Sequence, residues 1–310
     1  MKSRFLLSAI VVVLFSIPRV APALAADEED EGNNNQIEDN LSSYTGDNAE
    51  GYLGPLRDAL GASLNSGIFM YAGVPKEGLH FRLDVKGMLV SFSDEDKVFE
   101  GKTETYFGEE QTVEVPTVVG DVNSVTVTDP QTSATFTFPG GFDIERFGLA
   151  VPQLTVGSIM GTEAVGRYIA VETGDNEIGD VKLLGLGLRH SLSSYLTSIP
   201  LDLAVTGFWQ KLEIGDDFID ATAMTVGVQG GKHFGILGAY AGLSYDSIDL
   251  DVSYDTSVNG EDETVDVDFE KQSTGHLTLG ATLKLGFIHL NGEYNQADNT
   301  SLAFGLGLGN

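Results

Sequence analysis

The densest group of potentially reactive side chains is the acidic segment "NGEDETVDVDFE" at residues 259–270. Its carboxylates are hard oxygen ligands of the kind that Ca²⁺ and Mg²⁺ prefer. Their spacing does not follow the EF-hand loop, so we expect at most weakly bound divalent cations; the alternative is a solvated acidic loop. The candidate metal ligands are Glu261, Asp262, Glu263, Asp266, Asp268 and Glu270.

The histidines give no sign of catalysis or of a tightly bound metal. They are isolated from one another in the sequence, at His80, His190, His233, His276 and His289. The H-E-x-x-H zinc motif and the G-x-S-x-G nucleophile turn are both absent from the sequence. We therefore predict that the protein is not an enzyme and has no cofactor beyond weakly bound divalent cations.

Other polar side chains occur at every second position of apolar segments, as in "LHFRLDVKGML" at 79–89. Successive side chains of a strand point to opposite faces, so these polar residues share one face. If the sheet closes into a barrel, that face lines the lumen, with the candidates His80, Arg82, Asp84, Lys86, Arg167, Gln210, Lys284 and Glu293. Mixed charges in a narrow lumen predict salt bridges that close it; the alternative is a polar constriction that selects a small solute by charge.

The same alternation identifies the strands. It covers 79–92, 147–158, 163–172, 181–190, 200–212, 220–230, 235–247, 275–285, 287–296 and 301–309. Alternation sustained over ~10 residues is typical of transmembrane β-strands, whereas soluble strands average ~5–6 residues. We predict an all-β fold, an antiparallel transmembrane β-barrel of about ten strands. Residues 93–146 contain further strand-like runs, which form an external β insertion or add a hairpin to make a barrel of about twelve strands.

The connections between these segments differ in a regular way. Acidic connections, such as 173–180 and 255–271, alternate with short, acid-free ones such as 230–235 and 285–288. Outer-membrane barrels have longer loops outside the cell and short turns in the periplasm. The pattern favours a membrane barrel with its apolar face toward lipid, and a soluble β protein is the alternative. Aromatic residues expected in the interfacial girdles are Phe81, Trp209, Tyr240, Tyr245, Phe287, Tyr294 and Phe304.

The N-terminal residues predict export. Lys2 and Arg4 precede the apolar run "FLLSAIVVVLFSI", and "ALA" at 23–25 supplies small residues for cleavage. We expect residues 1–25 to be a secretory signal peptide, used by the general secretory pathway of a Gram-negative bacterium to reach the outer membrane. Residues 26–48 are acidic and poor in apolar side chains, and we predict that they are disordered.

The remaining residues, 49–310, form the predicted barrel domain. Within it, 49–70 is a helix or plug segment and 93–146 an extracellular β insertion. Leucines from Leu53 to Leu64 have helical spacing, Pro55 suits a first turn and Gly67 suits a stop. A helix at 53–64 is short, so it must dock on the barrel as a plug or cap, or on the sheet of a soluble protein.

Composition excludes some partners. The chain has no cysteine, which rules out disulfides, and a formal net charge of −29, which disfavours nucleic acid. The predicted partners are outer-membrane lipid and lipopolysaccharide, the barrel-assembly machinery, and a small hydrophobic or polar solute.

Several motifs carry a resemblance to known proteins. "YLGPLRDALGASLNSGIF", "FRLDVKGM", "GTEAVGRYIAV" and "GLGLRHSLSSYL" followed by a P-L-D-L strand resemble an uncharacterised family of Gram-negative outer-membrane β-barrels. More distantly, the chain is similar to uptake barrels for hydrophobic solutes. It ends in Asn310, whereas such barrels commonly end in an aromatic residue. The resemblance implies location and fold, and no activity.

These observations predict a function in small-solute passage or binding. The alternatives are a structural or surface-display barrel with acidic extracellular loops, and a soluble secreted β-rich protein that binds a ligand.

Overall fold

A computed structural model describes residues 40–41, 44, 46–69, 71, 73–75, 78–103, 110–171, 180–193, 195–196, 198–215, 218–258 and 261–309, without the side chains of 255–263. The predicted signal peptide and the predicted disordered residues 26–39 lie outside the described residues. From Asn40 onward the acidic segment is partly described, and its Leu41 and Tyr44 are buried.

The chain folds as two compact units. One consists of Met1–Arg57, Phe92–Phe147 and Val252–Asp268, and the other of Asp58–Ser91, Gly148–Asp251 and Phe269–Asn310. The second unit contains nearly all of the barrel strands. Among the described residues, no helix is long and apolar enough to cross a membrane.

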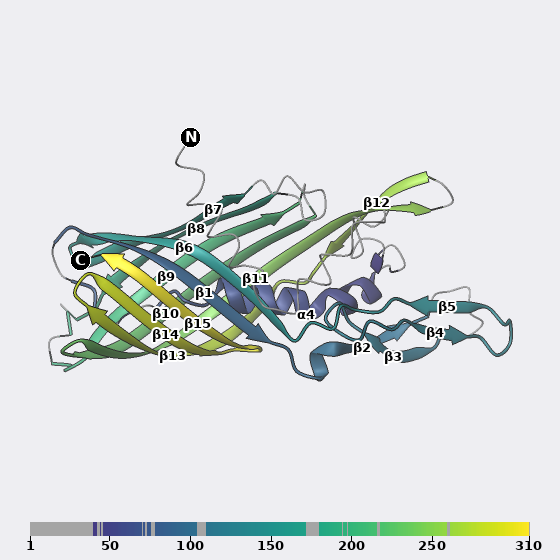
Figure 1. The fold of residues 1–310 in the computed structure, drawn as a ribbon, viewed down its shortest axis with the longest axis horizontal. Coiled ribbons are helices and arrows are strands. Elements are labelled where there is room, and N and C mark those ends of the chain that lie inside the picture. The colour runs from purple at the N-terminus through teal and green to yellow at the C-terminus, as the bar shows by residue number, and fades with distance from the viewer. Residues whose placement is uncertain are drawn as a thin grey trace. The chain divides into compact units, whose positions relative to one another are not determined.

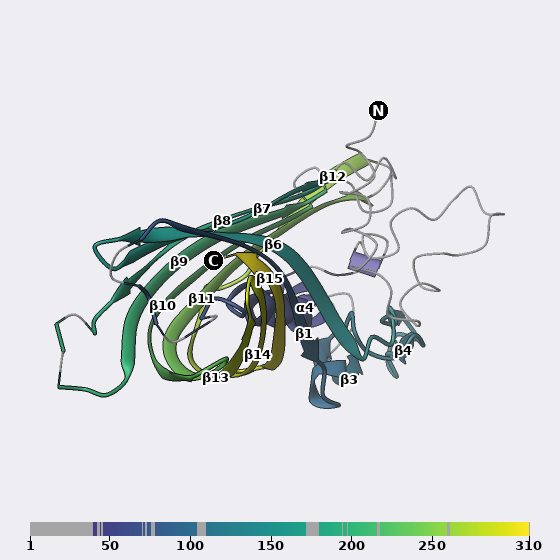
Figure 2. The same ribbon diagram turned by 60° about the vertical axis from the view of Figure 1, so that its left-hand side comes forward.

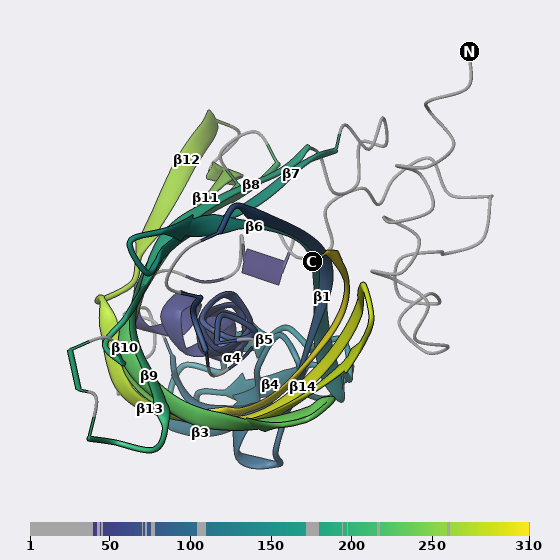
Figure 3. The ribbon, with the colours of Figure 1, turned by 90° about the vertical axis from the view of Figure 1, so that its left-hand side faces the viewer.

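Ten antiparallel strands close into a ring, which confirms the predicted fold class (Figures 1 and 3). In order around the ring they are β1 (His80–Ser91), β6 (Arg146–Ile159), β7 (Thr162–Val171), β8 (Val181–Ser191), β9 (Asp202–Ile214), β10 (Ile219–Phe234), β11 (Leu237–Val258), β13 (Gln272–Leu285), β14 (Ile288–Gln296) and β15 (Thr300–Gly309). Two long-range pairings, β1 with β6 and β1 with β15, place the first barrel strand between the next barrel strand in the sequence, β6, and the last, β15. Figure 2 shows β13, β14 and β15 as neighbours in one wall.

The two faces of the wall differ in polarity. On β1 the side chains of Phe81, Leu83 and Val85 are exposed, whereas those of Arg82 and Asp84 are buried. The same alternation exposes Leu184, Leu186 and Leu188 on β8, and Leu302, Phe304, Leu306 and Leu308 on β15. The outside of the barrel is therefore apolar and the inside polar, the reverse of a soluble barrel.

The first unit contains the insertion, which does not contribute a hairpin to the barrel. Strands β2 (Val98–Lys102) and β3 (Thr112–Pro116) form one small sheet, and β4 (Val125–Thr128) and β5 (Thr135–Phe138) another, with the short helix η2 (Glu95–Lys97) before them. The alternative of about twelve barrel strands is thus wrong, and the predicted number of about ten is confirmed. Each of these strands has only four or five residues, too short to span hydrocarbon at the ~9–11 residues that a tilted strand needs.

The acidic segment after β11 is not simply a loop. β11 continues to Val258, and β12 (Glu261–Asp268) pairs back with it outside the ring. Val265 and Val267 alternate with Asp266 and Asp268 and give this segment β propensity despite its charge.

Helix α4 (Asp47–Leu64) begins earlier than the sequence predicts, so Pro55 lies inside it rather than in its first turn. Asp47 and Glu50 occupy the first turn, where carboxylates interact favourably with the positive end of the helix dipole. In the first unit Tyr52 is buried beside Tyr44, with ring centroids 5.2 Å apart, and this packing stabilises the added turns.

The polarity of the outer face can be tested with one charge. Leu243, 61% exposed on β11, lies opposite Leu277 on β13, and Val122 in the insertion is 63% exposed. In lipid vesicles, Leu243→Arg should reduce barrel stability by about 2–4 kcal/mol because an arginine near the bilayer centre is poorly solvated. Gel mobility with and without boiling measures the folded fraction. Val122→Arg is the control and should change it little; equal effects of both variants would contradict a lipid-facing barrel.

The tyrosine core of the first unit gives a pH prediction. Burial raises the pKa of Tyr52 from 10.0 to about 12, against the opposing effect of the hydrogen bond from Asn40. Below pH 10 the phenol is neutral in both states; between pH 10 and about 12 only the unfolded chain ionises, so the free energy of unfolding falls as pH rises. A near-ultraviolet absorbance titration of wild type minus Tyr52→Phe should show a midpoint near pH 12. A midpoint at the ordinary value would refute this.

Candidate functional site

The barrel lumen contains a segment that we name the plug: residues 58–69 and 71, which comprise the last turns of α4 and the chain after it. Figure 3 shows this part of α4 within the ring of strands. Ile68 of the plug packs with Val165 and Phe208 of the wall, and Phe69 packs with Tyr240. The plug is attached to the wall by such buried apolar side chains and by a set of hydrogen bonds.

Arg167 on β7 holds the end of the helix. Its Nη1 donates a hydrogen bond to the carbonyl oxygen of Leu64 at 3.0 Å, and its Nη2 to that of Ser66 at 2.8 Å. It also donates to the side-chain oxygens of Gln153 at 2.8 Å and Gln210 at 3.1 Å. The last carbonyls of a helix lack partners within it and carry partial negative charge, so a buried cation with several donors satisfies them.

A glycine lets these side chains meet across a strand. In the wall, Arg167 lies opposite Gly185 on β8, and Gly185 lies opposite Gln210 on β9. A Cβ at Gly185 would stand 2.9 Å from the Phe208 ring and 3.1 Å from Cγ of Gln210. Arg167 and Gln210 therefore come together over Gly185, and a larger residue would displace them.

Gly67 turns the chain after the helix and forms a second attachment. Its φ of +73° lies in the left-handed region that favours glycine, and its N–H donates to Oε2 of Glu293 at 3.0 Å. The other carboxylate oxygen of Glu293 accepts from the Tyr240 hydroxyl at 2.7 Å. Glu293 on β14 thus connects the plug to two parts of the wall.

A second charged cluster surrounds Tyr71 at the end of the plug. Glu163 on β7 accepts hydrogen bonds from Arg189, from His80 at 2.9 Å, and from the Tyr71 hydroxyl. The guanidinium carbons of Arg82 and Arg189 lie 4.4 and 4.1 Å from the Tyr71 ring centroid, within cation–π range. Glu163 and Arg189 have no exposed side-chain surface, so each charge depends on the other for stabilisation.

Two further hydrogen-bonded pairs involve charged residues of β1. Arg82 donates to Asp84 at 2.8 Å, and Nζ of Lys86 donates to Oδ1 of Asn291 at 2.8 Å. All of these side chains except Asn291 are buried. Charges of both signs are therefore distributed along the inner wall and connected by hydrogen bonds.

The structure places the predicted lumen residues as follows. The side chains of Arg82, Asp84, Lys86, Arg167, Gln210 and Glu293 are buried, and His80 is half-buried. Lys284 has the same strand parity but is exposed, because β13 ends one residue later. Whether these residues select a solute stays a prediction.

The predicted metal ligands do not form a site among the described residues. The side chains of Glu261, Asp262 and Glu263 lie outside the described set, while Asp266, Asp268 and Glu270 are exposed. Asp266 accepts a hydrogen bond from Ser253 at 2.7 Å. Within the part of the chain that the structure describes, no three His, Cys, Asp or Glu residues could hold a metal ion together.

Sequence reasoning missed several residues of the lumen: Tyr71, Gln153, Glu163, Arg189 and Tyr240. Tyr240, expected in the outer girdle, is instead buried at the inner wall. Strand register was the available signal, since Glu163 lies opposite Arg189 and Gln153 opposite Arg167 in adjacent strands. Tyr71 carried no such signal because it belongs to no strand.

A closed antiparallel sheet with an apolar outside and a polar, charged inside defines the class: this is a β-barrel of the outer-membrane type. Its interior binds the plug. The chain belongs to the Family of unknown function (DUF6588), whose model matches residues 1–310. The comparison with curated proteins gives no match.

Solved structures of outer-membrane proteins are similar to the chain at low identity. OmpTdeltaL8, a loop deletion mutant of OmpT from Vibrio cholerae, shares 13% identity over 75% of this chain and 97% of its own, with a TM-score of 0.28. The translocator domain of the autotransporter NalP from Neisseria meningitidis shares 14% over 84% and 99%, with a TM-score of 0.28. The Ralstonia pickettii toluene transporter TbuX shares 9% over 77% and 90%, with a TM-score of 0.25.

The contacts of Arg167 predict how firmly the plug is held. Arg167→Met keeps a long side chain but removes every donor, leaving helix carbonyls with fewer partners. The free energy of plug opening should fall by about 1.5–3 kcal/mol, the value of hydrogen bonds to a charged group. Hydrogen exchange at the amides of 64–69 should then accelerate roughly 10–150-fold. Arg146→Met, at the exposed start of β6, is the control. Unchanged hydrogen exchange in Arg167→Met would show that the contacts of Arg167 do not hold the plug.

Proposed function

We propose that the protein is an outer-membrane β-barrel for the passage of small solutes, with the plug as its gate. The observation that carries the proposal is the polar attachment of the plug to the wall. Arg167 and Glu293 of the wall form hydrogen bonds with the plug, and Ser66 of the plug forms one with the wall. Water and polar solutes can replace such hydrogen bonds at modest net free energy. A plug held in part by such hydrogen bonds can leave the wall more readily than one held by apolar packing alone.

The size of the barrel supports small solutes. Ten strands enclose a lumen little wider than that of eight-stranded barrels, which side chains fill, and far narrower than that of 16–18-stranded porins. Charged residues of both signs line the passage that would open, so it would favour polar solutes over apolar ones. The proposal involves no catalysis, and divalent cations would enter only as weak ligands of the acidic segment.

The proposed setting follows from the outer face. Exposed leucines on neighbouring strands would be unfavourable in water, which argues against the soluble alternative. We expect this face to contact lipid and lipopolysaccharide after secretion and insertion by the barrel-assembly machinery. A structural or surface-display role remains the second candidate, because the first unit contains two small sheets that closure of the ring does not require.

A reversible lock tests the gate. Ser66 on the plug and Ser301 on β15 have hydroxyl oxygens 2.6 Å apart, and the chain contains no cysteine. Ser66→Cys with Ser301→Cys should therefore form a disulfide on oxidation that fixes the plug to the wall. In a planar bilayer, we expect the wild type to show occasional conductance openings and Arg167→Met to show more. The oxidised double variant should show no openings, and reduction of its disulfide should restore them.

Ser66→Cys alone, which should not respond to oxidant, is the control. Unaltered openings in the oxidised double variant would show that the plug is no gate. Absence of openings in every variant, Arg167→Met included, would disprove solute passage and favour the structural role.

A further inference from the structure

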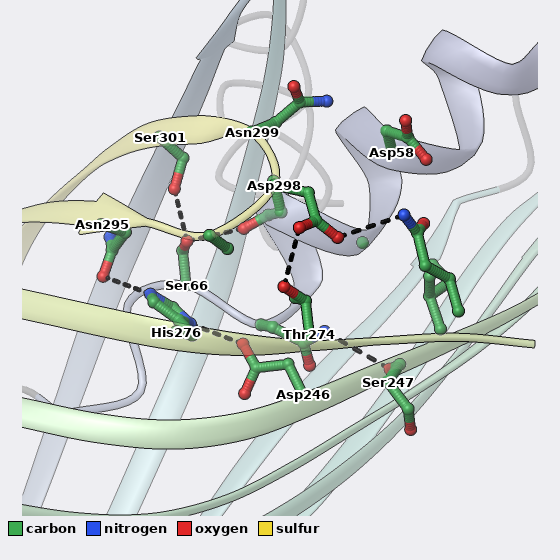
Figure 4. A pocket seen from close by; sticks show the side chains of 16 residues that line it. Asp58, Ser66, Asp246, Ser247, Thr274, His276, Asn295, Asp298, Asn299 and Ser301 are labelled. Atoms are coloured by element: carbon green, nitrogen blue, oxygen red, sulfur yellow. Dashed lines mark hydrogen bonds and ion pairs between the residues drawn. The ribbon is translucent and has the colours of Figure 1, made fainter.

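The plug starts at the end of the barrel where β14 turns into β15. Asp58, its first residue, lines a small pocket together with Asp298 and Asn299 of that turn (Figure 4). Further along the plug, the hydroxyl oxygen of Ser66 lies 2.6 Å from that of Ser301, the second residue of β15. The start of the plug is therefore fixed to one end of the ring.

The last residue of the plug reaches the opposite end of the barrel. The hydroxyl of Tyr71 donates a hydrogen bond to Glu163, which follows the tight turn 160–161 at the start of β7. The carbonyl oxygen of Tyr71 accepts a hydrogen bond from Gln229, in the second half of β10. His80, the first residue of β1, contacts the same Glu163 at 2.9 Å. The chain thus passes along the lumen and leaves it where β1 begins.

The length of this segment is sufficient to cross a membrane. Residues 58–64 are helical and span roughly 10 Å at 1.5 Å for each residue. Residues 65–75 add at most about 36–40 Å when extended. The apolar band of an outer-membrane barrel is only ~25 Å tall, so this part of the chain can connect its two sides.

The wall fits the passing chain closely. A Cβ added at Gly227 or Gly242 of the wall would stand 2.9 or 3.0 Å from the ring of Phe69, so these glycines make room for that ring. On the plug, a Cβ at Gly61 would stand 3.1 Å from the side chain of Ile248. Small residues on both sides of the contact therefore allow the chain to occupy a narrow lumen.

The two ends of the barrel differ in the connections that they carry. The tight turns 160–161, 235–236 and 286–287 lie at the end where β1 begins. The insertion 92–145 and the hairpin of β11 with β12 lie at the other end, where the plug starts. Outer-membrane barrels have short turns in the periplasm and longer loops outside the cell. By this rule the plug starts at the outer side and ends at the periplasmic side.

We propose that the barrel exports its own N-terminal segment through its lumen, so that residues 40–57 lie on the outer side of the membrane. After secretion the whole chain is in the periplasm, and β1 starts at the periplasmic end of the barrel. Residues upstream of the plug must then cross the membrane, and the plug is the part that stays in the passage. Arg167 and Glu293 bind it there and anchor the exported segment to the wall. This export goes beyond solute passage and does not require it.

Single cysteines can report the side of the membrane, because the natural chain has none. Asp47→Cys lies in the first turn of α4, where the side chain is 83% exposed. Asn123→Cys, exposed in the insertion, marks the side of the long connections, and Ser198→Cys, exposed between β8 and β9, marks the side of the tight turns. The full chain is produced in a Gram-negative host, and intact cells are treated with a maleimide coupled to a polymer too large for porins. Labelling in detergent gives the total, and gel mobility without boiling checks that each variant is folded.

We expect Asp47→Cys and Asn123→Cys to be labelled on intact cells as fully as in detergent, and Ser198→Cys to be labelled only in detergent. Protection of Asp47→Cys on cells whose Asn123→Cys is labelled would place the N-terminal segment in the periplasm and overturn the proposal. Labelling of Ser198→Cys on intact cells, or protection of Asn123→Cys, would overturn it too, because the barrel would not have the orientation that export requires.

The labelling result is separate from conductance. A silent bilayer together with labelled Asp47→Cys would refute solute passage alone. A conducting barrel together with protected Asp47→Cys would refute export of the N-terminal segment alone.

Discussion

Closure of the sheet is the constraint on which the rest of the structure depends. Hydrocarbon offers no hydrogen-bond partners, so every barrel strand must pair on both sides, and β1 does so by lying between β6 and β15. That pairing joins segments from opposite ends of the chain, as between Val85 and Leu306. Once the ring is closed, the alternation of each strand leaves one face for lipid and directs the other into a confined lumen.

Charged side chains in the confined lumen need partners, and the plug supplies some of them. Charges such as Lys86, Arg167 and Glu163 are stable in a narrow interior only when they have partners. The wall supplies some, as Arg189 does for Glu163, and the plug supplies others through the carbonyls at the end of α4. The helix end in turn gains donors that it lacks on its own. Each part thus satisfies groups that the other would leave buried and unpaired.

This arrangement connects stability with gating. Polar attachments tie the plug to the wall specifically, yet each can be exchanged for water at a small net free energy. The first unit, with its tyrosine core, is compact by itself.

The sequence by itself determined the strands, their number near ten and the polarity of their faces, because alternation is a local property that survives in any fold with period-two side chains. It also located α4, although not its first turns, which depend on packing around Tyr52. Only the tertiary structure decided that Glu163 pairs with Arg189, that Arg167 reaches Leu64, and that Tyr240 faces inward. Those contacts join residues far apart in the chain and require both the strand register and the position of the plug, which no single segment encodes.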